Sequence, residues 1–314
     1  MKVFLKGFLR NLLEKPWRVS ASLRYLLFLR QSRRDALLVQ KVGATLGLAV
    51  LSSHRRTPSH PRKDTLFILA GGSSVNELSP TNWEEVDQGL SIGMNFWPIH
   101  PYVPDILTSE TDGKTPSNPF LNTLLAHPAI TKKSPAMLIL RTPWPPVSQI
   151  LPFLPPTFAG KTWVYGRANL ITRRLENLPG DLQKVIKAVK LGRLPAPVLP
   201  DNGSSVARLT FYGISQGFKR IVWVGVDQNS GHYFWTEPPV PTHFEKAAKE
   251  VPRVAGKPHS TSSNFGRSFS NDHFLRALAQ TLAVDFDTQI YVSSATSSLS
   301  DSVPVFKWQN TKAA

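Results

Sequence analysis

Six short apolar segments alternate with helical patterns between residues 65 and 293, and this alternation restricts the fold more than any other feature. Each segment is four to seven residues long and rich in Leu, Ile, Val or Phe, which is typical of buried strands. Strands that alternate with helices favour a doubly wound, mostly parallel, Rossmann-like α/β sheet. The predicted strands are residues 65–70, 90–95, 106–109, 137–141, 220–226 and 289–293.

The segments between the predicted strands indicate helices at residues 169–190, 204–216 and 271–282. Ser204 or Ser205 can cap the second of these helices, and Gly217 stands where a glycine commonly ends one. The Pro-rich segment 142–160 and the polar segment 236–267 are predicted to be loops.

Basic residues are concentrated in the N-terminal fifth of the chain. The whole chain carries a net charge of +16, of which residues 1–63 contribute +12, with Glu14 and Asp35 as their two acids. We therefore predict two units: a basic amphipathic helical extension with its linker at residues 1–63, and an α/β domain at residues 64–314. Because the α/β domain is nearly balanced in charge, nucleic acid is not an expected partner.

Residues 1–30 place apolar side chains such as Phe4 and Phe8 at mostly helical spacing, with Lys2, Lys6 and Arg10 between them. A basic amphipathic helix of this kind suits an anionic membrane surface. A helix packed on the domain, with its charged face in water, explains the same pattern equally well. The sequence has no uncharged apolar run of about 18 residues, the length that crosses a bilayer. We therefore predict a cytoplasmic protein that is peripheral on the inner face of a membrane.

The chain contains no cysteine, which excludes disulfides, thiolate metal sites and a cysteine nucleophile. Its one Asp-x-Asp sequence, at Asp285 and Asp287, falls in a predicted turn before the last strand, so we predict no metal site and no cofactor.

A small-residue loop, Gly71-Gly72-Ser73-Ser74, follows the first predicted strand. Small residues there let backbone N–H groups approach an anion, as in a phosphate cradle. A tight strand-to-helix turn uses the same residues, and both interpretations remain open. Asp227 follows the strand 220–226, and ligands of parallel sheets bind beyond such carboxyl ends.

Three blocks of sequence, in this order, resemble the bacterial sialyltransferases of glycosyltransferase family 42 and their motility-accessory and pterin-pyrophosphokinase-like relatives. The first is ILAGGSSV at residues 68–75, and the second is GMNF at residues 93–96. The third is GFKRIVWVGVD at residues 217–227, which a tyrosine, Tyr233, follows after six residues. A Ser-rich end after the last strand, IYVSS at residues 290–294, completes a resemblance over about residues 65–300.

The resemblance implies a sialyltransferase-like variant of the Rossmann-like fold and a donor that is a CMP-activated nonulosonic acid. It further implies that the small-residue loop and the asparagine hold the nucleotide and that the serines at the helix start and the tyrosine contact the donor sugar or phosphate. The residues that it points to are Gly71, Gly72, Ser73, Ser74, Asn95, Ser204, Ser205, Gly225, Asp227 and Tyr233.

A histidine is expected as the general base, because its pKa near neutrality suits removal of a proton from the acceptor hydroxyl. His259 is the first candidate and His273 the second, although neither aligns cleanly with the family pattern. A further departure is Asn229, which stands where the family has its first tyrosine.

The sequence therefore predicts a glycosyltransferase that moves a sialic-acid-like sugar from a CMP-activated donor to a glycan or glycolipid acceptor without a metal. One alternative is an ATP-dependent, Mg²⁺-requiring pyrophosphokinase-like phosphotransferase of the related branch. Another is a basic binding protein with no enzymatic activity.

Overall fold

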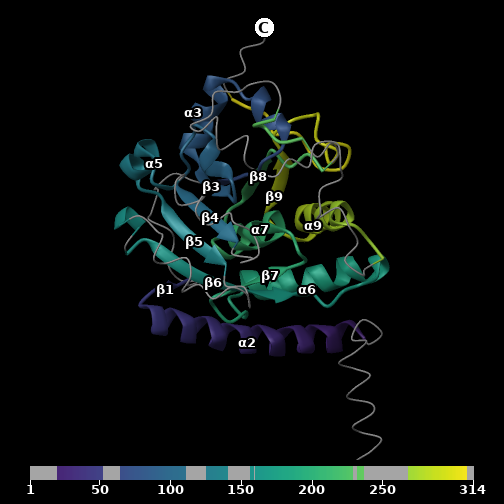
Figure 1. Ribbon diagram of the computed structural model, residues 1–314. Coiled ribbons are helices and arrows are strands. Elements are labelled where there is room, and N and C mark those ends of the chain that lie inside the picture. The colour runs from purple at the N-terminus through teal and green to yellow at the C-terminus, as the bar shows by residue number, and fades with distance from the viewer. Residues whose placement is uncertain are drawn as a thin grey trace, which may run out of the picture.

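The computed structural model describes residues 20–51, 64–110, 125–140, 156–158, 160–228, 232–236 and 268–309. Its centre is a nine-stranded sheet in the order β1-β6-β5-β4-β3-β2-β8-β9, with β7 paired to β6 (Figure 1). Each of these pairings is parallel, which confirms the predicted α/β class. The strands are β1 (Ala49–Val50), β2 (Thr65–Leu69), β3 (Leu90–Met94), β4 (Ile106–Glu110), β5 (Ala136–Leu140), β6 (Thr162–Asn169), β7 (Val198–Asp201), β8 (Arg220–Val224) and β9 (Gln289–Val292).

The strand order reverses between β2 and β8. From β2 the chain adds β3, β4, β5 and β6 on one side, and later places β8 and β9 on the other side. The connections that leave the two neighbouring strands therefore diverge, which opens a crevice at their carboxyl ends. The fold itself thus points to the ends of β2 and β8 as the place for a ligand.

Helices pack on both faces of the sheet, and the complete burial of β2 explains why both faces need packing. Leu66 and Ile68 belong to one hydrophobic core, whereas Phe67 and Leu69 belong to the other. Successive side chains of a strand point to opposite faces, so a strand buried along its whole length requires packing on both. The helices are α2 (Ala21–Leu46), α3 (Pro80–Gln88), α5 (Pro128–Lys133), α6 (Leu178–Lys190), α7 (Ser205–Ser215) and α9 (Asn271–Asp285), and a 3₁₀ helix, η2, spans Ser73–Glu77.

The first helix described, α2, packs against the edge of the sheet. The Arg24 guanidinium donates to both carboxylate oxygens of Asp181 on α6, at 2.8 and 3.0 Å, and both side chains are buried. After α2, the short strand β1 pairs with β6. Residues 21–50, which the sequence assigned to the N-terminal extension, therefore share the core of the body. The rest of the predicted extension and linker, residues 1–19 and 52–63, lies outside the described residues.

The helix predicted at residues 169–190 was wrong over residues 169–174, and residues 175–177 form a short 3₁₀ helix before α6. Strand β6 occupies Thr162–Asn169, and α6 begins only at Leu178. The strand was not predicted from the sequence because a glycine and an arginine interrupt its apolar pattern. A side chain at Gly166 would lie 2.6 Å from Val39 of α2, so the glycine allows the helix to approach the sheet closely. Among the described helices, none is both long and apolar enough to cross a membrane.

Candidate active site

The loops that follow β2 and β8 remain joined beyond the ends of the two strands. The Ala70 amide donates to the carbonyl of Val224, and the Gly72 amide donates to the carbonyl of Gly225, both at 2.8 Å. Two of the sequence blocks that were predicted to form the site, 150 residues apart in the chain, are therefore in direct contact.

Asp227 fastens the two loops together through Ser74. The Ser74 hydroxyl donates to one carboxylate oxygen at 2.5 Å, and the Ser74 amide donates to the other at 2.9 Å. Burial raises the pKa of Asp227, as does the nearby charge of Glu77, while the hydrogen bonds from Ser74 and Ser73 oppose the rise. The polar groups of Ser74 thus hold the loop in place, and Ser73 is the more accessible serine of the pair.

The glycines of this loop are required by close contacts. A Cβ atom on Gly72 would lie 2.3 Å from an oxygen of Asp227 and 2.5 Å from the carbonyl of Gly225. Gly225 has a φ of +69°, which lies in the left-handed region that favours glycine. The small-residue loop is therefore shaped to pack against the end of β8.

An aromatic segment, Tyr233–Trp235, lies across the small-residue loop. The Phe234 amide donates to the carbonyl of Gly71 at 2.9 Å, and Tyr233 forms an antiparallel bridge with Gly72. The rings of Tyr233 and Trp235 are stacked, with centroids 4.4 Å apart and planes inclined by 7°. Burial raises the pKa of the Tyr233 hydroxyl further above neutrality, and the protonated hydroxyl can donate a hydrogen bond.

Asn95 lies at the carboxyl end of β3, beside the end of β2. Its φ is +57°, and its backbone N–H donates to the carbonyl of Thr108 at 2.9 Å. The next residue, Phe96, contacts the Trp235 ring edge-on, with centroids 6.4 Å apart. The second sequence block therefore meets the aromatic segment.

The start of α7 is held by a buried ion pair. Arg208 and Asp201 are 1% and 0% exposed, and a guanidinium nitrogen of Arg208 donates to Asp201 at 2.8 Å. A second nitrogen of Arg208 donates to the Ser205 hydroxyl at 3.1 Å. The amide of Gly203 donates to the same Asp201 oxygen at 2.9 Å, and Ser204 caps the helix. This network orients both predicted serines.

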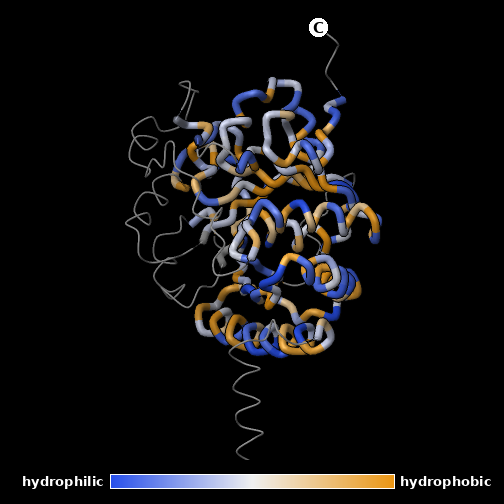
Figure 2. The backbone as a smooth tube through the Cα atoms, turned by 90° about the vertical axis from the view of Figure 1, so that its right-hand side faces the viewer, coloured by the Kyte–Doolittle hydropathy of each residue, from blue (hydrophilic) through white to orange (hydrophobic). Residues whose placement is uncertain are grey.

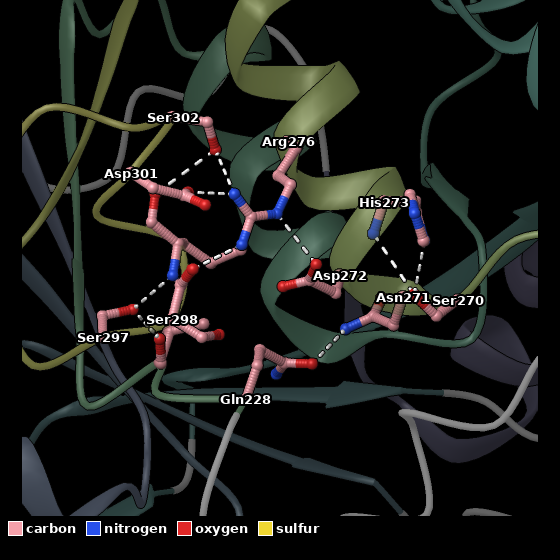
Figure 3. Close-up of polar contacts among 12 residues, drawn as sticks. Gln228, Ser270, Asn271, Asp272, His273, Arg276, Ser297, Ser298, Asp301 and Ser302 are labelled. Atoms are coloured by element: carbon pink, nitrogen blue, oxygen red, sulfur yellow. Dashed lines mark hydrogen bonds and ion pairs between the residues drawn. The ribbon is translucent and has the colours of Figure 1, made fainter.

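A chain of side-chain amides connects the start of α7 to the end of β8, and Figure 3 shows its contact between Asn271 and Gln228. Asn202 donates to Asn271 at 3.2 Å, and Asn271 donates to Gln228 at 3.2 Å. Gln228 immediately follows Asp227, and Asn271 is the first residue of α9. These hydrogen bonds connect three segments of the carboxyl edge of the sheet. None of the three amide side chains was predicted from the sequence, where the one indication is that Gln228 directly follows the candidate Asp227.

The Ser-rich C-terminal segment donates hydrogen bonds to the residues that follow β8. Ser297 donates its hydroxyl to the carbonyl of Val226 at 2.8 Å, and the Ser298 amide donates to the carbonyl of Asp227 at 3.2 Å. Arg276 of α9 contacts Asp301 and donates to the Ser302 hydroxyl at 2.6 Å, which fixes the segment against the helix (Figure 3). Within α9, Asp272 accepts from the same guanidinium at 2.8 Å.

Of the two predicted bases, His259 lies outside the described residues. His273 lies in the first turn of α9, is exposed, and has its Nδ1 atom 2.9 Å from the Ser270 hydroxyl (Figure 3). It follows Asn271 by two residues and so belongs to the same edge of the sheet. In the described part of the chain, no three His, Asp or Glu side chains form a group that could hold a metal ion.

No protein-family model and no curated protein matches the chain. Solved structures of the sialyltransferase CstII are similar to it in fold. One, in complex with a trisaccharide acceptor and CMP, is 11% identical over 80% of this chain and 89% of that chain, with a TM-score of 0.44. Another, CstII from Campylobacter jejuni with cytidine-5'-monophosphate, is 12% identical over 82% and 89% of the two chains, with a TM-score of 0.43.

Proposed function

We propose that this chain is a glycosyltransferase that transfers a sialic-acid-like sugar from a CMP-activated donor to a glycan or glycolipid acceptor. One observation carries the proposal: the three sequence blocks that resemble glycosyltransferase family 42 meet at the switch point of the sheet. Gly72 pairs with both Gly225 and Tyr233 there, and Phe96 contacts Trp235. The sequence resemblance suggests the class of donor, and these contacts support the proposal that the donor binds at this edge.

The residues of the edge divide into a nucleotide side and a sugar side. Gly71, Gly72, Ser73 and Asn95 offer small loops, a hydroxyl and an amide to the nucleotide. Ser204, Ser205 and the protonated Tyr233 hydroxyl offer donors to the phosphate or sugar, and the N-terminus of α7 adds partial positive charge. The positions of these groups are fixed by the hydrogen bonds between Ser74 and Asp227 and by the one to Gly225.

The proposed reaction needs no oxidant or metal. A histidine, His259 or His273, accepts the proton of an acceptor hydroxyl while that oxygen forms a bond to the anomeric carbon of the donor. The bond from this carbon to the phosphate oxygen breaks, and its electron pair leaves with CMP. Hydroxyl and backbone donors stabilise the charge that the departing phosphate gains.

A comparison of nucleotides tests the donor class. We expect CMP to raise the melting temperature of the full chain, with or without Mg²⁺, because a ligand that binds only the folded state stabilises it. UDP, GDP and ATP should leave the melting temperature unchanged. A rise with ATP that depends on Mg²⁺, and none with CMP, would replace this proposal with the phosphotransferase alternative.

We also propose that the protein acts while peripheral on the inner face of a membrane, reached through the basic residues 1–30. The charge of +12 in residues 1–63 supports this location, because the cytoplasmic leaflet attracts Lys and Arg.

A further inference from the structure

Helix α2 has one packed face and one outer face. Its packed face contributes buried side chains to the body, including Phe28, Ala36 and Val39. The helix runs along one border of the molecule (Figure 1), and its tube alternates hydrophobic and hydrophilic residues along its length (Figure 2). The residues that recur every three or four positions on the outer face are Leu26, Arg30, Arg33, Leu37 and Lys41, all exposed.

The outer face combines large apolar side chains with cations. Leu26 and Leu37 are 59% and 66% exposed, so neither is used by the packing of the body. Arg30, Arg33 and Lys41 share the face with them. The one acid of the helix is Asp35, whose side chain is 17% exposed and lies 4.0 Å from Arg34. The outer face is therefore cationic and partly apolar.

We propose that the outer face of α2 is a docking surface for an anionic membrane. Leu26 and Leu37 are eleven residues apart, so they lie about 16 Å apart along the helix and on nearly the same side. Both can enter the boundary between headgroups and acyl chains of one flat surface, while the arginines between them contact lipid phosphates. The inference deepens the proposed location at a membrane, extends it to a folded helix, and does not depend on the identity of the donor.

The pattern favours a membrane over two other occupants. Nucleic acid offers phosphates to the arginines but gives two exposed leucines no apolar environment. A second copy of the chain, joined through α2 about a two-fold axis, would bring the cationic faces together, and like charges at an interface are unfavourable. An anionic bilayer offers both an apolar layer and negative charge.

Flotation of the full chain with lipid vesicles tests the inference. We expect binding to vesicles of phosphatidylcholine mixed with phosphatidylglycerol, weak binding to phosphatidylcholine alone, and weaker binding as salt is added. The double variant Arg30→Gln/Arg33→Gln should bind the anionic vesicles about twenty-five-fold more weakly, since each cation contributes roughly a fivefold factor. Leu37→Ser should weaken binding about tenfold, since burial of one leucine corresponds to at least this factor.

A matched control removes two charges elsewhere, with Lys132→Gln on α5 and Lys307→Gln in the C-terminal segment, both exposed. This control should bind like the original chain. Equal vesicle binding by the arginine variant and the control would overturn the inference, as would an oligonucleotide that displaces the vesicles. Self-association that the arginine variant abolishes would also overturn it, in favour of a second copy.

The melting-temperature response to CMP separates the two proposals. It should be unchanged in the Arg30→Gln/Arg33→Gln variant, because α2's outer face is not part of the predicted nucleotide site. Loss of vesicle binding with an intact response to CMP supports the docking surface. Vesicle binding without any response to CMP leaves the docking surface standing and removes the donor proposal.

Discussion

The hydroxyl of Ser74 donates to one carboxylate oxygen of Asp227 at 2.5 Å, while the amide of the same residue donates to the other oxygen at 2.9 Å. One carboxylate thereby satisfies two donors of a loop that is 153 residues away in the chain. The loop after β2 depends on this contact for its conformation, since Ser74 is buried and its polar groups need partners.

Removal of the Asp227 carboxylate should destabilise the protein. Asp227→Ala leaves the Ser74 amide and hydroxyl without an acceptor, and we expect a loss of about 3 kcal/mol in the free energy of unfolding. Asp227→Asn can accept from the Ser74 amide with Oδ1 and donate to the Ser74 hydroxyl with Nδ2, so it should cost less than about 1 kcal/mol. Urea titration of both variants measures the difference, and equal losses would show that the two hydrogen bonds do not hold the loop.

The raised pKa of Asp227 predicts how its effect on stability varies with pH. Because the folded pKa lies above the ordinary value of about 4, the folded chain binds this proton more tightly than the unfolded chain does. The resulting stabilisation is complete below about pH 4 and is lost as the pH rises through the folded pKa. Asp227→Asn cannot ionise and escapes this loss, so its stability relative to the original chain should rise between about pH 4 and neutrality. Urea titrations across this range check the trend, which a constant difference would contradict.

Gly72 should tolerate no side chain. Gly72→Ala places a methyl group 2.3 Å from an Asp227 oxygen, and overpacking of this kind costs about 1–3 kcal/mol. Gly180, in the first turn of α6, is the matched control because a Cβ atom there meets no atom within 4 Å. We expect Gly180→Ala to be neutral or slightly stabilising and to keep the response to CMP, whereas Gly72→Ala should lose it. Thermal unfolding with and without CMP compares the two, and equal behaviour would contradict the close packing at Gly72.

Arg208 should be essential to the structure at the start of α7. Arg208→Ala leaves the fully buried Asp201 carboxylate without its main partner, which typically costs about 3–5 kcal/mol. The double variant Arg208→Met/Asp201→Asn removes both charges of the pair, and should lose less than the sum of the losses in Arg208→Met and Asp201→Asn alone. A double-mutant cycle by urea unfolding measures this coupling. Additive losses would mean that Asp201 and Arg208 do not interact in solution.

The sequence predicted the strands near the site well, because each of them is buried on both faces and reads as a continuous apolar run. The predicted strand at residues 220–226 and the helix ended by Gly217 are confirmed by β8, by α7 and by the φ of +80° at Gly217. The strands nearest α2 were harder to predict: β6 contains Gly166 and Arg167, and β1 has only two residues. Their place in the sheet depends on packing with α2, which no local pattern records.

The polar partners of the site could not be predicted from sequence for a similar reason. Ser74 and Asp227 are 153 residues apart, and Asn202 and Asn271 are 69 apart. A single sequence shows that each residue is polar, but only the fold brings the partners together. The convergence of Gly72, Gly225 and Tyr233 was foreseeable because parallel strands end at a common edge.

Asn95 and His259 should affect different steps of the proposed reaction. We expect Asn95→Ala to weaken CMP binding at least tenfold, because the side-chain amide of Asn95 is predicted to contact the nucleotide. Its φ of +57° adds a backbone penalty of about 1 kcal/mol for alanine. Asn95→Gly removes the side-chain amide without this penalty, so it should restore stability but not CMP binding.

His259→Ala should leave CMP binding unchanged and lower turnover by about a hundredfold or more, the usual contribution of a general base. Calorimetric titration with CMP and release of CMP from a CMP-activated sugar measure the two quantities, and an equal loss of affinity in both variants would contradict this division of roles.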